Sequence, residues 1–208
     1  MRILMTNHGL HTIGGTETWT ETMATELINR GHDVEIATFI PGLMAGRMPC
    51  RVFQFAQWDG KPYDLQIVNH NTCLAMVQRI PGFKIFTSHG PSHQLEAPAP
   101  GADCYVAVSE EVRGARTWPK AAFVIRQPID MQRFRPQPAL RPDADVLVMT
   151  KNAEAAKLAM IACQKAGLTH TLAHYVLNPV DDPSEFIPLH RAVITSGRGI
   201  LEALACGI

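Results

Sequence analysis

The stretch from Met1 to Gly31 places the strongest constraint on what this chain can fold into. Residues 2–7 (RILMTN) have the length and apolar composition of a buried strand, and residues 8–15 (HGLHTIGG) form a glycine-rich loop. A helix pattern follows, and residues 32–39 (HDVEIATF) predict a second strand. A strand, a loop, a helix and a second strand in this order predict two parallel strands joined by a crossover helix.

The helix after the glycine loop is predicted from Thr16 onward, because apolar side chains recur on one of its faces. These apolar residues are Trp19, Met23, Leu27 and Ile28. Thr16 or Thr18 is suited to cap the first turn, and Gly31 is suited to end the helix. Gly14 and Gly15 let a ligand approach a helix N-terminus, where unpaired N–H groups favour anions. The alternative is that both glycines only shape a tight turn.

The composition argues against several classes of protein. Of the 208 residues, 46% are apolar and 18% are charged, so a sizeable core is available. A net charge of zero argues against a nucleic-acid partner. The 5 cysteines include no CxxC pair, so we expect no zinc site and no disulfide framework, and reduced thiols fit a cytosol. No signal peptide and no apolar run of ~18 residues is present, so we expect a cytoplasmic protein and leave peripheral membrane contact open.

The rest of the chain alternates strand patterns with helix patterns, which predicts an α/β fold with parallel sheets. Strands are predicted at 51–55, 64–68, 84–87, 104–108, 123–125, 145–150, 171–177 and 192–195. Helices are predicted at 72–79, from the capping residue Ser109 onward, at 153–166 and at 200–205. The apolar face of the helix at 153–166 is expected to hold Leu158, Ile161 and Ala162.

A proline-rich stretch at 126–143 divides these patterns, because its prolines prevent a regular element and stiffen the connection. We therefore expect two domains, at 1–140 and 141–208. The second domain is short for a complete doubly wound half.

Polar residues follow several predicted strands of the first domain, at 7–9 (NHG), 69–71 (NHN) and 88–90 (SHG). In open parallel sheets the carboxyl edge is where ligands bind. Each histidine taken alone is also compatible with a helix cap or a loop residue. Histidines and asparagines that converge on one edge favour a functional site.

Four stretches together resemble the GT-B glycosyltransferases, specifically the retaining family 4 group. They are residues 14–17 (GGTE), 106–112 (VAVSEEV), 126–136 (RQPIDMQRFRP) and 197–207 (GRGILEALACG). The last stretch is the most specific, and the four follow the family's order. The resemblance implies two Rossmann-like parallel-sheet domains, the second short or incomplete because the chain looks truncated at its C-terminus. It also implies a nucleotide-sugar donor, an unidentified acceptor, and retaining transfer without a metal or cofactor.

The last stretch also has a physical reading of its own. Gly197 and Gly199 leave backbone N–H groups open at a helix N-terminus, and Arg198 adds a cation, a combination suited to a diphosphate. The resemblance implies that Glu202 accepts hydrogen bonds from a ribose diol. The alternative is a surface glutamate that the helix dipole stabilises.

The resemblance also implies roles for other residues. Lys151 and Lys157 have the position and spacing of the family's cations that neutralise the leaving diphosphate, although both are compatible with solvated helix lysines. His89 and His70 take the positions of strand-end groups near the donor sugar and the acceptor, which makes them the candidate catalytic residues. Gly14, Gly15 and Thr16 complete the expected donor-side set.

Two departures from the family pattern stand out: Gln127 replaces the usual asparagine of the third stretch, and Ile194 replaces a glutamate. The family has two glutamates separated by seven residues; the second is at the Glu202 position, and the residue at the position of the first is Ile194. The departure at Ile194 keeps a second interpretation open, in which the chain is a non-catalytic or truncated nucleotide-sugar-binding module of the same fold. An unrelated α/β domain is a third.

Overall fold

The computed structural model describes residues 1–137, 144–174, 178, 180 and 182–208. Several predictions fall partly outside this range: the end of the proline-rich stretch at 138–143, the domain boundary at residues 140 and 141, and the end of the predicted strand at 175–177.

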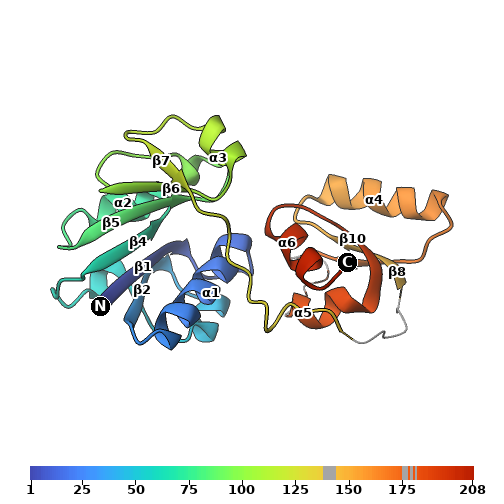
Figure 1. The fold of residues 1–208 in the computed structure, drawn as a ribbon, viewed down its shortest axis with the longest axis horizontal. Coiled ribbons are helices and arrows are strands. Elements are labelled where there is room, and N and C mark those ends of the chain that lie inside the picture. Colours follow the sequence, from blue (N-terminus) through green and yellow to red (C-terminus); the bar gives the residue numbers. More distant parts are fainter. Residues whose placement is uncertain (138–143, 175–177, 179, 181) are drawn as a thin grey trace. The chain divides into compact units, whose positions relative to one another are not determined.

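The chain forms two compact units, Met1–Pro128 (unit 1) and Ile129–Ile208 (unit 2), each with its own sheet (Figure 1). The division falls earlier in the chain than the expected boundary. The reason is that Phe134 is buried in the core of unit 2 and Ile129 packs against the same cluster. Ile129 and Phe134 of the proline-rich stretch therefore belong to the second core.

Unit 1 contains a seven-stranded parallel sheet in the order β3-β2-β1-β4-β5-β6-β7. Its strands are β1 (Arg2–Gly9), β2 (Asp33–Ile40), β3 (Arg51–Gln54), β4 (Leu65–Asn69), β5 (Phe83–Ser88), β6 (Cys104–Ala107) and β7 (Ala122–Val124). Its helices are α1 (Gly15–Asn29), α2 (Asn71–Val77) and α3 (Glu110–Ala115), with short 3₁₀ turns η1 (Leu43–Arg47), η2 (Phe55–Gln57) and η3 (Gln94–Glu96).

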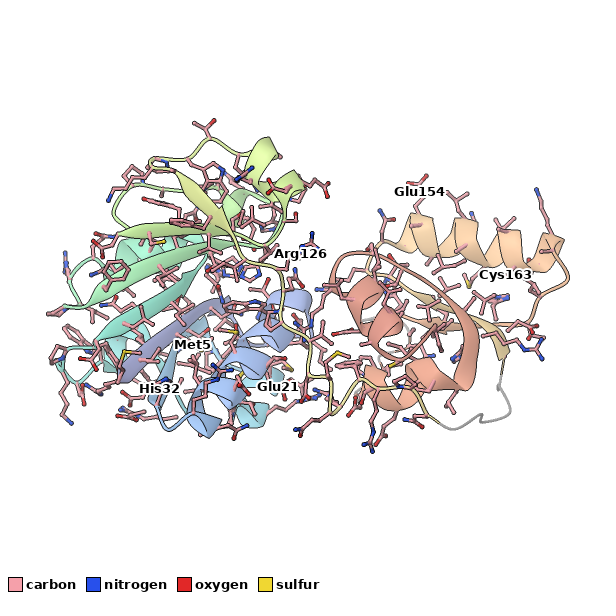
Figure 2. The ribbon with its side chains drawn as sticks, in the orientation of Figure 1. Met5, Glu21, His32, Arg126, Glu154 and Cys163 are labelled. Carbon is pink, nitrogen blue, oxygen red and sulfur yellow. The ribbon has the colours of Figure 1, made fainter. Side chains whose placement is uncertain are left out.

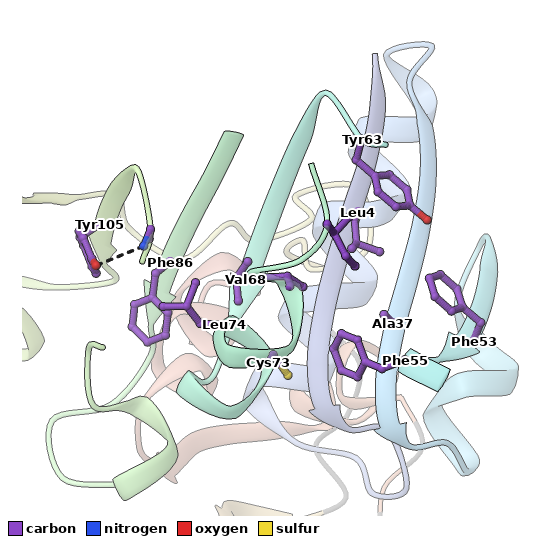
Figure 3. Packing of buried hydrophobic residues seen from close by; sticks show 13 residues of the cluster. Leu4, Ala37, Phe53, Phe55, Tyr63, Val68, Cys73, Leu74, Phe86 and Tyr105 are labelled. Atoms are coloured by element: carbon purple, nitrogen blue, oxygen red, sulfur yellow. Dashed lines mark hydrogen bonds between the residues drawn. The ribbon is translucent and has the colours of Figure 1, made fainter. Parts of the chain in front are cut away.

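Both faces of this sheet are buried, because side chains alternate along each strand. Leu4 points to a cluster that contains Val68, Phe86 and residues of α2 (Figure 3). Its neighbours Ile3 and Met5 point to a second cluster, which α1 covers. Helices α1 and α2 therefore lie on opposite faces of the sheet. Because the strands are parallel, the loops that lead from β1 to α1, from β4 to α2 and from β6 to α3 all lie at the carboxyl edge of the sheet.

The β1–α1–β2 unit has the predicted parallel pairing, and the predicted apolar face of α1 packs on the sheet. The predicted threonine cap is wrong. Gly14 is the N-cap residue and provides no side chain, and the Thr18 hydroxyl instead donates to the Gly14 carbonyl at 2.9 Å. Gly31 has φ +81°, a conformation that favours glycine, and it follows the end of the helix as predicted. Ser109 caps α3 as predicted, since its Oγ accepts from the Val112 N–H at 3.2 Å.

Unit 2 contains a three-stranded parallel sheet in the order β10-β8-β9. Its elements are β8 (Ala144–Met149), α4 (Ala153–Lys165), β9 (His170–Ala173), α5 (Pro183–Phe186), η4 (Ile187–Leu189), β10 (His190–Thr195) and α6 (Arg198–Ala205). The core on one face includes Leu147, Ile187 and Ala203, together with Phe134 from the start of the unit.

The predicted packing face of α4 is wrong. Leu158 is 62% exposed and Ile161 is also exposed, whereas Ala156 and Cys163 are buried against the sheet. Figure 2 shows Cys163 on the side of α4 toward the strands and Glu154 on the opposite side. Ala156 and Cys163, with the partly buried Ala159 and Met160, pack against Val146 and Val148 of β8.

Candidate functional site

The carboxyl ends of β1, β4 and β5 are neighbours in the sheet, and they bring three histidines to one edge. The His8 backbone N–H donates to His70 Nδ1 at 3.1 Å, and the two rings meet edge to face at 6.3 Å. His8 Nδ1 lies 2.9 Å from the Thr72 hydroxyl. Burial and the neighbouring His70 and His11 lower the pKa of His8. We call this group, with His89, the histidine cluster.

His89 follows β5, and three neighbours fix its position. Its Nε2 lies 2.9 Å from Asn69 Oδ1, and its ring meets Trp19 of α1 edge to face at 4.8 Å. Its backbone N–H donates to Glu96 Oε2 at 2.7 Å. Backbone and ring are thus held by different elements of unit 1.

A buried polar network fixes which atoms donate around His89. The Thr20 hydroxyl donates to the Thr16 carbonyl at 2.8 Å and accepts from Asn69 Nδ2 at 3.2 Å. Because the Asn69 amide nitrogen faces Thr20, its oxygen faces His89, so His89 Nε2 is the donor of that pair. Asn7 Nδ2 donates to the same hydroxyl at 3.2 Å. The side chains of Asn7, Thr20 and Asn69 are fully buried.

Glu96 is the member of the site that sequence reasoning missed. It lies on η3, outside every predicted strand and helix, and its Oε1 is 3.4 Å from His70 Nε2. Burial would raise the pKa of Glu96, but the hydrogen bond from His70, the charges of His89 and His70, and the His89 N–H together lower it. A single glutamate in a loop has no spacing pattern, so the sequence offered no signal for it.

The backbone at His70 is strained. Its φ is 72° and its ψ is 138°, and among the described residues it is the one non-glycine residue with positive φ. Such a conformation costs on the order of 1–3 kcal/mol and is concentrated at functional sites. The surrounding contacts with His8 and Glu96 are what hold this ring in place.

The predicted glycine turn of unit 1 belongs to the same edge. Gly14 is buried at the start of α1, and Gly15 is exposed, with no atom within 4 Å of where a Cβ would lie. Thr16 contributes its carbonyl to the network that ends at His89. The structure therefore links this turn with the histidine cluster.

In unit 2, the predicted donor-side residues lie at the carboxyl ends of two adjacent strands. Thr195 of β10 pairs with Met149 of β8, so the loop with Lys151 and the start of α6 are neighbours. Gly197 is the N-cap of α6 and has φ +60°, which favours glycine. A Cβ on Gly199 would lie 2.9 Å from Met149 Cε, so α6 approaches β8 closely there.

The two charged residues of α6 are bonded to each other. Arg198 Nε donates to Glu202 Oε1 at 2.8 Å, and the side chains are only 6% and 9% exposed. Arg198 thus orients the carboxylate expected to bind a ribose. Lys151 and Lys157 are exposed. Ile194 is 42% exposed on β10 and pairs with Val148.

Solved structures that resemble this chain are glycosyltransferases of the GT-B fold. Anabaena HepE, solved in complex with UDP and glucose, has a TM-score of 0.68 and 14% identity, and the match covers 100% of this chain and 79% of that chain. The apo lipopolysaccharide outer core galactosyltransferase WaaB has a TM-score of 0.63 and 13% identity, with 100% and 79% covered. An α-glucosyltransferase in complex with UDP and a 13-mer DNA containing an HMU base has a TM-score of 0.61 and 13% identity, with 99% and 78% covered.

The chain therefore has the GT-B fold, as the sequence resemblance predicts. No family model matches the chain. No curated protein matches it either. Within the described ranges, no helix has the length and apolar character needed to cross a bilayer.

Proposed function

We propose that the chain is a glycosyltransferase that moves a sugar from a nucleotide-diphosphate sugar to an acceptor with retention. The observation that carries this proposal is the fold, which the chain shares over its whole length with glycosyltransferases solved in complex with UDP. The residue types at the two sheet edges fit this chemistry. Unit 2 offers N–H groups, cations and a carboxylate, and unit 1 offers a rigid set of histidines.

In unit 2, the backbone N–H groups at Gly197 and Gly199 would bind the diphosphate at the start of α6. Exposed Lys151 and Lys157 would neutralise the charge that develops on the leaving group. Glu202 would accept hydrogen bonds from the ribose hydroxyls. A carboxylate has room for about four hydrogen bonds, so the bond from Arg198 leaves acceptor capacity for the ligand.

In unit 1, Gly14, Gly15 and Thr16 would border the sugar, and His89 and His70 would be the candidate catalytic side chains. Catalysis would come from positioning and from electrostatic stabilisation of the departing diphosphate, and this chemistry needs no metal. We leave open whether the acceptor is a glycan, a lipid or a small molecule.

Ile194 favours a second candidate function. An isoleucine replaces the glutamate that the resembled family uses there, and its side chain can neither accept a hydrogen bond from a sugar hydroxyl nor carry charge. A chain of this kind would bind the nucleotide sugar without transferring the sugar.

Calorimetric titration with UDP-, GDP- and ADP-sugars tests the proposal. We expect at least one donor to bind with a Kd of about 1 μM to 1 mM, unchanged by EDTA. Glu202→Gln should weaken binding at least about tenfold, whereas the matched control Glu154→Gln, an exposed glutamate of α4, should not. Absence of binding to every donor would overturn the proposal.

Turnover separates the two candidate functions. Incubation of the wild-type chain with the donor that binds, followed by chromatography for the free nucleoside diphosphate, detects both transfer and donor hydrolysis. Release of the diphosphate supports the transferase. Binding without release selects the non-catalytic module.

A further inference from the structure

We infer that Glu96 is a positioning residue that fixes both histidines of the proposed site, and that His70 is held by it as the Nε2–H tautomer. Any effect of Glu96 on catalysis rests on the proposed function, whereas its contacts with the two histidines do not depend on that proposal. The contacts of each histidine carry the inference separately.

Both ring nitrogens of His70 are already used inside unit 1. Nδ1 accepts from the His8 backbone N–H, and a backbone N–H can only donate, so Nδ1 carries no proton in this state. The proton of the neutral ring is then on Nε2, which faces Glu96 Oε1 at 3.4 Å. The side chain of His70 is only 9% exposed. His70 is therefore engaged on both sides, and it is a poor candidate for exchanging a proton with a substrate.

The same carboxylate holds the chain at His89. Glu96 Oε2 accepts the His89 N–H at 2.7 Å, a short bond typical of an ionised acceptor. The His89 ring is fixed independently, by Nε2 donating to Asn69 Oδ1 and by the edge-to-face contact with Trp19. The two oxygens of one carboxylate thus set the ring of His70 and the backbone of His89.

Glu96 can do this because its own segment is anchored. The Ser88 hydroxyl donates to the Glu96 carbonyl at 2.9 Å. Asn71 Nδ2 donates to the Gln94 carbonyl at 2.9 Å, which ties η3 to the start of α2. Arg116 Nη2 donates to the Gly90 carbonyl at 3.0 Å and to the His93 carbonyl at 2.6 Å. The carboxylate is therefore a fixed point.

This arrangement divides the roles of the two predicted catalytic histidines. His70 is buried and transmits the position of Glu96 to β1 through the His8 N–H, whereas His89 is half-buried and its ring is held by Asn69. Both donors at Glu96 are N–H groups, so an ionised carboxylate satisfies them, whereas an amide satisfies only one.

The test is ¹⁵N NMR of histidine-labelled protein at pH 8, combined with amide hydrogen exchange. In the wild type we expect His70 to carry its proton on Nε2. Glu96→Gln should keep its oxygen on the shorter His89 bond and turn its NH₂ toward His70, so the His70 tautomer signal should change while His89 exchange changes little. Glu96→Ala should change the His70 signal and speed His89 exchange by about tenfold or more.

Glu35→Gln is the matched control, because Glu35 is a buried carboxylate of the same unit whose partners are Arg2, Arg51 and Tyr63. It should lower stability and leave both histidine readouts unchanged. A wild-type His70 protonated on Nδ1, or a Glu96→Ala variant with unchanged signals, would overturn the inference.

Turnover provides a separate readout if the chain transfers sugar. Glu96→Ala, which removes both contacts, should lower kcat by about tenfold or more and leave the donor Kd unchanged, since these contacts lie in the histidine cluster. An unchanged kcat would overturn the positioning role. Absence of turnover in the wild type would count against the proposed function alone, because the NMR measurements need no donor.

Discussion

The buried ion pair of α6 permits a quantitative prediction about unit 2. Truncation of Arg198 to alanine leaves Glu202 with its side chain only 9% exposed and without the donor that now lies 2.8 Å away. Removing one partner of a buried pair costs about 3–5 kcal/mol, because the remaining charge is desolvated without compensation. A whole domain has a free energy of unfolding of about 5–15 kcal/mol, so this loss is a large part of the total.

Native-state hydrogen exchange is the appropriate assay, because it assigns the loss to individual elements. A cost of about 4 kcal/mol corresponds to a roughly thousandfold decrease in the protection of the slowest amides of β8 and β10. The matched control is Arg191→Ala. That arginine is 71% exposed and 3.6 Å from Asp145, so its loss should lower protection by less than roughly tenfold. Amides of β1 in unit 1 serve as the internal reference.

Two outcomes separate the possible explanations. If Arg198→Ala reduces protection by no more than Arg191→Ala, the pair contributes little and the argument from burial is refuted. Glu202→Gln should be milder, because the amide oxygen still accepts from Arg198 Nε. A glutamine variant as damaging as the arginine truncation would show that charge, rather than the hydrogen bond, dominates.

Two further predictions concern pH and packing. The pKa of Glu96 is lowered from its ordinary value of 4.5, so the contribution of the ionised carboxylate to stability is present above pH 4.5 and is lost as pH falls through the folded-state pKa. The difference in urea midpoint between the wild type and Glu96→Gln should therefore shrink from pH 7 to pH 3. A difference that stays constant over this range would contradict the prediction. Gly199→Ala should lower the free energy of unfolding by about 1 kcal/mol, because crowding of the new methyl group against Met149 and Thr195 outweighs the gain in helix propensity. Gly15→Ala places its methyl group in open space and should raise the free energy of unfolding by about 0.5 kcal/mol. Thermal unfolding that finds Gly199→Ala as stable as the wild type would refute this prediction.

The parts of the fold that sequence reasoning predicted are those set by local pattern. The β1–α1–β2 unit follows from one apolar run, one periodic stretch and one glycine stop at Gly31, and the observed bounds differ by one or two residues. The helix start is less determined by sequence, because Thr18 has the chemistry of a cap but its hydroxyl donates to the carbonyls of Gly14 and Gly15. Composition near a helix start does not decide which residue becomes the cap.

The packing of α4 could not be predicted because it depends on the opposite surface. Leu158 and Ile161 give the stronger apolar signal along the sequence, and the structure buries Ala156 and Cys163 instead. The buried face of α4 is the one that packs against Val146 and Val148 of β8, and the periodicity of the helix alone does not specify this tertiary contact. Glu96 escaped prediction for a similar reason, since its partners lie 7 and 26 residues away on other strand ends.

The buried polar network of Asn7, Thr20 and Asn69 beneath the histidine cluster contributes less to the free energy of folding than an apolar core of the same volume could. Asn7, Thr20 and Asn69 are fully buried, and replacing both partners of a buried hydrogen bond with apolar groups of the same shape can be neutral or stabilising. Their hydrogen bonds run in one direction, from His89 through Asn69 and Thr20 to the Thr16 carbonyl, and so they specify one tautomer and one orientation of the His89 ring. A sheet edge that only had to be shielded from solvent would not require a fixed tautomer and orientation of the His89 ring. Replacing Thr20 with valine keeps the shape and removes the hydroxyl, so His89 should lose its fixed orientation in ¹⁵N spectra even where the fold survives.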